Sequence, residues 1–260
     1  MTFTDAIGQL HACAPDARIV SLVPSITELL CDLGLAGRMV GRTGFCIHPA
    51  ETVRAIPKVG GTKDVNLAKL RALAPTHVVV NIDENEKPTV DEIATFVPHV
   101  VVTHPVTPLD NVGLARLMGG VFGQPEAAEA WCANFLNEYT ALSAEPRQAA
   151  RVLYCIWQDP WMTISAGTYI ANMLALKGWK IPNLGSARYP AFTWADELVR
   201  SLDAVFLSTE PYRFTEEHVD ALERQLGIPV RLVDGEMFSW YGSRALAGLR
   251  YLRALGPAPV

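Results

Sequence analysis

The feature of this sequence that most constrains its fold is a helix, strand and polar-loop pattern that occurs in both halves of the chain. In the first half, Val59–Asn85 combines a leucine-striped helix, a stop at Pro75 and a short β-branched run at His77–Val80. In the second half, Trp194–Glu210 repeats the leucine-striped helix, the short strand and the polar loop. Short apolar strands between helices are typical of a buried parallel sheet, so an α/β fold is expected.

A second pair of segments supports duplication. Arg18–Gly34 reads as a basic residue, a strand, a loop, a helix and a closing glycine, and Arg151–Gly178 has the same order with a longer loop. Any two strand–helix units resemble each other, which is the alternative explanation. The matching order of the units in both halves favours two similar lobes.

A long helix is predicted between the two halves. From Glu126 to about Glu145 the apolar residues fall on one side, and about 20 residues of helix make a rod of about 30 Å. The sequence thus predicts two Rossmann-like α/β lobes bridged by a single long backbone helix, with the lobes at residues 1–110 and 149–260 and the connecting helices at 111–148. In such sheets ligands bind at the carboxyl ends of the strands, so a ligand cleft is expected between the lobes.

Composition excludes several classes of partner. The chain of 260 residues is 50% hydrophobic and 19% charged, with a net charge of −5, which favours neither nucleic acid nor an anionic membrane. No apolar run approaches the roughly 20 residues of a membrane helix, so no membrane insertion is expected. The first 18 residues lack the features of a signal peptide, which predicts a cytoplasmic protein as written, or a periplasmic one if a leader has been removed. The five cysteines match no zinc spacing.

Aromatic side chains cluster in three predicted strand-end loops of the second half. Five of the six tryptophans of the chain lie after residue 150. Rings gathered in loops indicate a broad apolar surface for a ligand. The alternative is that they cap the sheet edge and pack against the long helix. The candidate ligand contacts in these loops are Trp157, Trp161, Tyr212, Phe238, Trp240 and Tyr241.

The first half offers mainly polar groups at its predicted loops. Ser25 is also expected to cap the helix that follows it, with Glu28 completing a capping box. Glu84 and Glu236 follow strands of different lobes and could form an acid pair, although both could equally be solvated. Further ligand-binding candidates of these loops are Phe45 and Lys63.

Cys46 and His48 are two residues apart in a loop that reads as exposed. This spacing could hold a soft metal or supply an axial cobalt ligand. The same two residues could form a thiolate pair for catalysis, but a two-residue spacing rarely places a base correctly. Signatures of the common hydrolases, phosphate-binding loops and zinc peptidases are missing from the sequence.

These segments resemble a known family. The stretches RIVSLVPSITELLCDLG and VGGTKDVNLAKLRALAPTHVVV, followed by the long helix and a second similar lobe, resemble the helical-backbone (class III) substrate-binding proteins of ABC importers, in particular vitamin B12 and iron-siderophore binders. The aromatic loops and DGEMFSWYGSR resemble the cobalamin-binding subgroup, also called helical backbone metal receptors. The resemblance implies a binding protein that requires no cofactor and holds a corrinoid or another bulky metal chelate between its lobes. It also implies aromatic contacts to the ligand, polar contacts from Ser25, Lys63, Glu84 and Glu236, and His48, with Cys46, as the candidate metal ligands.

The sequence departs from the importer pattern where the family carries one glutamate on each lobe to dock the permease. Alanine stands at both positions, Ala68 and Ala195, although Asp196 or Glu197 could substitute in a shifted alignment. Losing both charges would remove the ion pairs that set the docking register, so permease docking is doubtful.

Two alternatives stay open at this point. A cytosolic enzyme could use the same cleft, with Cys46, His48, Glu84 and Glu236 acting on a small aromatic or cofactor-derived substrate. A structural or regulatory protein with a vestigial cleft is the other alternative.

Overall fold

The computed structural model describes residues 1–259, which divide into two compact units. Unit 1 comprises Met1–Pro105, Leu109–Leu136 and Tyr241–Arg244, and unit 2 comprises Val106–Pro108, Asn137–Trp240 and the described residues from Ala245 onward. A boundary between the units falls inside the long helix α6 (Pro125–Ser143), which occupies the segment predicted for it. The stretch Tyr241–Arg244, far along the sequence, belongs to unit 1.

Unit 1 contains a four-stranded sheet in the order β4-β3-β5-β6. Its strands are β4 (Met39–Arg42), β3 (Ile19–Ser21), β5 (His77–Asn81) and β6 (His99–Thr103), and every neighbouring pair is parallel. The predicted α/β class with a parallel sheet is therefore confirmed. Because the strands are parallel, their carboxyl ends meet at one edge of the sheet.

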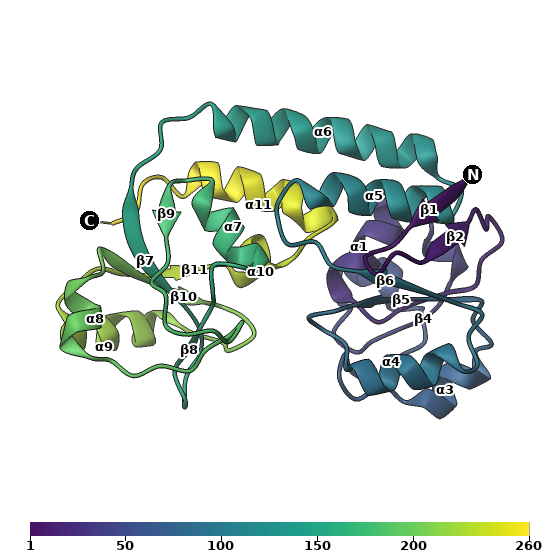
Figure 1. Cartoon of the computed structure of the whole chain (residues 1–260), viewed down its shortest axis with the longest axis horizontal. Helices are drawn as coiled ribbons and strands as arrows, with labels where there is room; N and C mark the ends of the chain where they lie inside the picture. Colours follow the sequence, from purple (N-terminus) through teal and green to yellow (C-terminus); the bar gives the residue numbers. More distant parts are fainter. Residues whose placement is uncertain (260) are drawn as a thin grey trace. The chain divides into compact units, whose positions relative to one another are not determined.

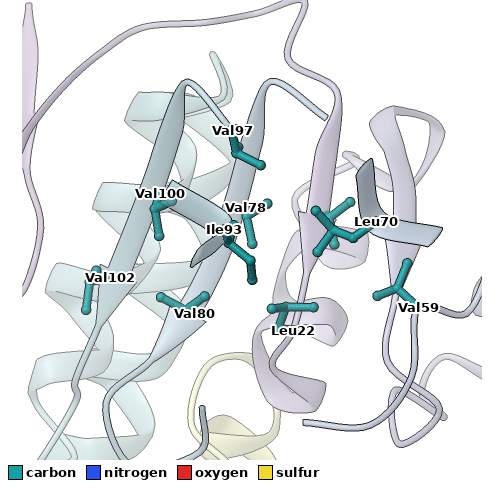
Figure 2. Packing of buried hydrophobic residues seen from close by; sticks show 10 residues of the cluster. Leu22, Val59, Leu70, Val78, Val80, Ile93, Val97, Val100 and Val102 are labelled. Atoms are coloured by element: carbon teal, nitrogen blue, oxygen red, sulfur yellow. The ribbon is translucent and has the colours of Figure 1, made fainter. Parts of the chain in front are cut away.

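Alternate residues of each strand build the core of unit 1. Val78 and Val80 of β5, with Val100 and Val102 of β6, lie in a buried cluster with Leu70, Ile93 and Val97, which come from the helical side (Figure 2). The helices on that face are α3 (Leu67–Ala72) and α4 (Lys87–Ala94), and the opposite face is covered by α1 (Pro24–Asp32) and α5 (Asp110–Val121) (Figure 1). The remaining helices of unit 1 are η1 (Ala36–Arg38), α2 (Ala50–Val53) and the first part of α6.

An N-terminal hairpin, which the sequence did not reveal, lies against the edge strand β6. Its strands are β1 (Thr2–Thr4) and β2 (Leu10–Ala12). The buried carboxylate of Asp5 accepts hydrogen bonds from the Val102 amide at 3.0 Å and from His11 Nε2 at 3.1 Å. Strands of three residues are too short for a periodic pattern, so only these contacts identify the hairpin.

The start of α1 differs from the prediction. The N-cap is Val23, Pro24 occupies the first turn, and no side chain caps the helix, so the capping box of Ser25 with Glu28 is wrong. Proline is preorganised for the first helical turn, and the helix starts two residues earlier than predicted. Glu28 is paired instead with Arg244, through two hydrogen bonds of 2.9 and 2.8 Å.

Unit 2 contains a second sheet in the order β11-β10-β7-β8, with β9 beside β7. The pairs of β10 with β11, of β10 with β7 and of β7 with β9 are parallel, and only the short β8 runs antiparallel to β7. The strands are β7 (Ala150–Trp157), β8 (Met162–Thr163), β9 (Trp179–Lys180), β10 (Ala204–Ser208) and β11 (Val230–Val233). β7, β10 and β11 carry the predicted buried strands, and their carboxyl ends again share one edge.

The helices of unit 2 lie on both faces of its sheet. α8 (Asp196–Arg200) and α9 (Glu216–Leu226) cover one face, and α7 (Tyr169–Ala175), α10 (Gly235–Ser239) and α11 (Ser243–Ala254) lie on the other (Figure 1). The stretch after Asp234 was predicted to be a loop, which is wrong: the Asp234 side chain accepts a hydrogen bond from the Glu236 amide at 3.0 Å and caps α10. Within residues 1–259, none of the helices combines the length and the apolar character that crossing a bilayer requires.

Candidate functional site

The carboxyl ends of the four parallel strands gather several loops at one edge of unit 1. We call this edge the unit 1 strand-end surface; its loops are residues 22–25, 43–48, 60–63 and 81–86. The buried Asn85 side chain ties three of them together: its Oδ1 accepts the Asn81 amide at 2.8 Å, and its Nδ2 donates to the carbonyls of Leu22 at 3.3 Å and Thr62 at 2.9 Å. The sequence did not identify Asn85 as important, because no local motif predicts its contacts with Thr62 and Leu22, which are 23 and 63 residues away.

The Cys46 thiol anchors the loop at residues 43–48. Its side chain is fully buried and lies 3.1 Å from the hydroxyls of both Thr27 and Thr43. Burial raises the pKa of the Cys46 thiol above its usual value, although the two hydroxyls oppose this effect. The expectation that this loop exposes its thiol is therefore wrong, since the neutral Cys46 points inward as part of the loop's support.

The residues on either side of Cys46 point outward instead. Phe45 is 62% exposed and Ile47 is 50% exposed, and Ile82, in the loop after β5, is 48% exposed. His48 is half-buried and precedes a cis proline. Ile47 and Ile82 were missed in the sequence, where nothing distinguishes an exposed isoleucine from a buried one. Large exposed apolar side chains at a strand-end edge are typical of a ligand surface.

The other predicted polar groups of unit 1 lie at different depths. Ser25 is buried, and Lys63 is exposed with its Nζ 4.0 Å from a carboxylate oxygen of Glu86. Among residues 1–259, no three His, Cys, Asp or Glu side chains come together in a way that could hold a metal ion. Metal ligation by His48 or Cys46 stays a prediction.

Glu84 is bound within unit 1 by a residue that is distant in sequence. The hydroxyl of the buried Tyr241 donates a hydrogen bond to the Glu84 carboxylate. Burial and the nearby Glu84 charge raise the pKa of Tyr241 well above its ordinary value, while the neighbouring Ser25 hydroxyl acts in the opposite direction. The Gly242 amide, next in the chain, donates to Asn111 Oδ1 at 2.6 Å. Three of the predicted residues, Ser25, Glu84 and Tyr241, are thus brought together.

The corresponding edge of unit 2 carries aromatic rings, some of them exposed and others buried. We call it the unit 2 strand-end surface; it comprises Trp157 at the end of β7, residues 158–162, 209–214 and 234–240. Trp157 is 40% exposed, and its ring meets that of Tyr212 edge-on at 5.4 Å. Trp161 stacks on Phe214 at 5.8 Å and meets Trp194 edge-on at 5.3 Å. Among these rings Trp157 is exposed, whereas Tyr212 and Trp161 are partly buried and pack against the core cluster of unit 2.

α10 brings a carboxylate and an indole together. Glu210 Oε1 accepts hydrogen bonds from Ser239 Oγ at 2.5 Å and from Trp240 Nε1 at 2.8 Å. Burial and the nearby charge of Glu236 raise the pKa of the Glu210 carboxyl, against the effect of these two donors. Glu236 is half-buried on α10, and Phe238 is fully buried beneath it, edge-on to Tyr154 at 5.5 Å. Sequence reasoning missed Glu210, whose partners are 29 and 30 residues away.

Comparison with curated proteins places these features among binding proteins. The family described as "Periplasmic binding protein" matches residues 19–190. The vitamin B12-binding protein of Pectobacterium carotovorum is 24% identical over 255 residues, which cover 95% of this chain and 92% of that protein. The vitamin B12-binding protein of Salmonella typhimurium is 28% identical over 163 residues, 62% of this chain and 60% of that protein.

Solved structures share the fold. The periplasmic vitamin B12-binding protein BtuF of Vibrio cholerae has a TM-score of 0.78 at 17% identity, covering 92% of this chain and 98% of that chain. The periplasmic haem-binding protein RhuT of Roseiflexus has a TM-score of 0.73 at 22% identity, covering 92% and 97%. These findings confirm the predicted resemblance and the prediction of a binding protein rather than an enzyme. The chain belongs to the periplasmic binding protein family.

Proposed function

We propose that this protein binds a corrinoid, or a closely similar bulky metal chelate, through its two strand-end surfaces. The observation that carries the proposal is the gathering of exposed rings and aliphatic side chains at the carboxyl ends of both parallel sheets. Phe45, Ile47 and Ile82 are exposed on unit 1, and the Trp157–Tyr212 pair lies at the corresponding edge of unit 2. A broad planar chelate presents the apolar area that such side chains contact.

The charges on these surfaces favour one class of chelate over another. On unit 1, Asp83, Glu84 and Glu86 outnumber Lys63. On unit 2, Arg213 is outnumbered by the acids Asp159, Glu210, Asp234 and Glu236. Carboxylates accept hydrogen bonds from amides and repel other carboxylates. A chelate rimmed with amides, as corrinoids are, therefore suits both surfaces better than one that carries carboxylates, such as haem.

The curated relatives support this choice. The curated relatives are named vitamin B12-binding proteins, whereas several structural neighbours are titled haem-binding proteins. The buried, protonated Cys46 does not favour the catalytic alternative, which needs a reactive thiolate. Two of the predicted ligand contacts, Phe238 and Tyr241, are buried. In the proposed function they support the exposed side chains rather than contact the ligand themselves.

Spectral and calorimetric titration tests the proposal. Cyanocobalamin, cobinamide, haem and a ferric siderophore are titrated at the same pH and salt concentration. We expect the two corrinoids to bind at least tenfold more tightly than haem, and Trp157→Ala to weaken their binding about tenfold. Trp179→Phe, which changes a buried ring beside Phe206, is the matched control. Tighter binding of haem than of both corrinoids would refute the assigned ligand class.

We also propose that the protein does not dock a permease through the paired acidic contacts typical of importer relatives. Ala68, in the first turn of α3, and Ala195, the N-cap of α8, are both exposed and uncharged. In a pull-down with a purified B12 permease, the wild type should bind weakly and Ala68→Glu/Ala195→Glu should bind more tightly. Tight binding of the wild type, through Asp196 or Glu197 for example, would contradict this proposal.

The compartment is the last part of the proposal. The family description favours the periplasm over the cytoplasmic location predicted from the sequence alone. Fractionation of native cells with an antibody against the protein decides between the two compartments.

A further inference from the structure

We propose that Glu210 is a positioning residue that fixes the Trp240 indole and the Ser239 hydroxyl at the unit 2 strand-end surface, so that the indole is preorganised for the ligand. The ligand part of this inference rests on the proposed function. The positioning part concerns unit 2 alone and does not require a ligand.

The geometry places both donors on one oxygen. Glu210 Oε1 accepts Ser239 Oγ at 2.5 Å and Trp240 Nε1 at 2.8 Å, and these donors come from the last turn and the C-cap of α10. An indole donates one hydrogen bond, so its direction sets the ring orientation. Glu210 therefore determines how the Trp240 ring lies on the half-buried surface.

The main chain of Glu210 is fixed as well. Ser208 Oγ donates to the Glu210 carbonyl at 2.6 Å, and the hydroxyl of Tyr154, in the middle of β7, donates to Ser208 Oγ at 3.0 Å. Gly235 packs directly against this group. A Cβ at position 235 would lie 2.4 Å from Ser208 Oγ and 2.5 Å from Glu210 Cγ, which is too close for any side chain. A chain of hydrogen bonds thus runs from the sheet core to the indole, and this preorganisation reduces the entropy cost of ordering the ring when a ligand binds.

Unit 1 contains a related contact. Glu84 follows β5 as Glu210 follows β10, and each glutamate accepts a hydrogen bond from an aromatic residue: Tyr241 for Glu84 and Trp240 for Glu210. The two aromatic residues are adjacent in the sequence, although one belongs to each unit.

The charge of Glu210 makes the positioning sensitive to pH. An ionised carboxylate is the stronger acceptor, so protonation weakens its hold on the indole. The charged groups that face Glu210 are Asp234 and Glu236, and the pKa of Glu210 is raised by burial first and by these charges next. Tyr154 and Tyr251 also lie nearby, and burial raises the pKa of both above the ordinary value of 10. Both tyrosines stay protonated, and therefore uncharged, through the acidic range.

The first experiment follows tryptophan emission of the ligand-free protein from pH 8 to pH 4. Subtracting the emission of Trp240→Phe isolates the Trp240 signal. We expect this signal to change in one step in the wild type and to stay flat in Glu210→Gln. Glu223→Gln should keep the step, because Glu223 holds the Val230 amide at the opposite end of the sheet, at 2.9 Å. Glu236→Gln should move the step to lower pH by removing a repelling charge. A step that persists in Glu210→Gln, or a wild type without one, overturns the inference.

The second experiment measures cyanocobalamin affinity at pH 7. Glu210→Gln should bind about tenfold more weakly than the wild type, with its melting temperature maintained, and Glu223→Gln should bind like the wild type. Unchanged affinity of Glu210→Gln, when the wild type binds, overturns the ligand part of the inference. If the wild type itself does not bind, the proposed function fails, and the emission experiment alone decides whether Glu210 positions Trp240.

Discussion

Buried polar side chains determine which groups of unit 1 reach its surface. Cys46 points inward against two threonine hydroxyls, and this places its neighbours Phe45 and Ile47 outside. Asn85 joins three loops through buried hydrogen bonds. The exposed residues that define the candidate site thus depend on buried polar residues that hold their loops in place.

The first prediction at this scale concerns Asn85. Asn85→Ala leaves one buried amide and two carbonyls without their partner, so the free energy of unfolding should fall by about 2–3 kcal/mol. Urea unfolding followed by circular dichroism measures it. Asn183→Ala removes an exposed asparagine that accepts a similar bond from the Gly185 amide, and it should cost less than about 0.5 kcal/mol. Equal losses in the two variants would contradict the assigned role of Asn85.

The second prediction concerns thiol reactivity. Burial raises the pKa values of both Cys46 and Cys155, whereas Cys13 is exposed. In the native protein at pH 8, a disulfide reagent should label Cys13 within minutes and leave Cys46 and Cys155 unlabelled until urea is added. Mass spectrometry of peptides identifies the labelled sites, with Cys13→Ser as the control. Rapid native labelling of Cys46 would restore the case for a reactive thiol.

At the scale of elements, the edge of the unit 1 sheet brings histidines together. His77 of β5 lies directly opposite His99 of β6, and their rings stack at 4.6 Å. Burial, followed by the charges of His99 and of His11 in the hairpin, lowers the pKa of His77 to about 4. The folded state therefore favours the neutral form of His77, and this links the free energy of unfolding to pH.

This linkage gives the third prediction. Because the folded-state pKa of His77 lies below the unfolded value of 6.5, its contribution is complete above pH 6.5 and is lost as the pH falls toward 4. Over this range the wild type should lose about 2–3 kcal/mol more than His77→Gln. Urea unfolding at pH 7, 5.5 and 4 measures the difference. His99→Gln should reduce the loss, and His218→Gln, on α9 of unit 2, should leave it unchanged. Parallel pH profiles for wild type and His77→Gln would disprove the linkage.

At the scale of the whole molecule, two units with the same plan differ in what they expose. The unit 1 surface is aliphatic with one phenylalanine, and the unit 2 surface is aromatic, while acids predominate on both. The net charge of −5 adds to the local repulsion of anionic ligands. In the proposed function, selection between chelates is therefore a property of the summed charges of both units.

The fourth prediction uses this selection. A ligand that binds only the folded protein stabilises it by about 2.7 kcal/mol at 100 times its Kd. Cobinamide should raise the melting temperature in proportion to the logarithm of its concentration, and haem at equal concentration should raise it less. Raising the salt concentration should narrow the gap, because screening weakens the repulsion. A larger shift with haem at low salt would count against the proposed ligand class.

Much of the fold followed from the sequence. The β-branched runs and leucine stripes located β5, β7 and β10 and the long helix α6, because burial on both faces of a parallel sheet imposes a strong local pattern. The hairpin β1–β2 and the short α10 were missed, since three to five residues carry too few repeats for a pattern. The carboxyl ends of these strands were also predictable, and so were most of the loops that form the two strand-end surfaces.

The sequence by itself determined a two-part α/β fold with aromatic strand-end loops, because periodicity and composition are local properties, and the family resemblance indicated the binding role. Only the tertiary structure decided which of those side chains are exposed and which hold others in place. It turned Cys46 inward, brought Tyr241 to Glu84 and placed the Trp240 indole on Glu210. These contacts join residues 19 to 157 positions apart, and such long-range pairs form only when packing brings distant strand ends to one edge.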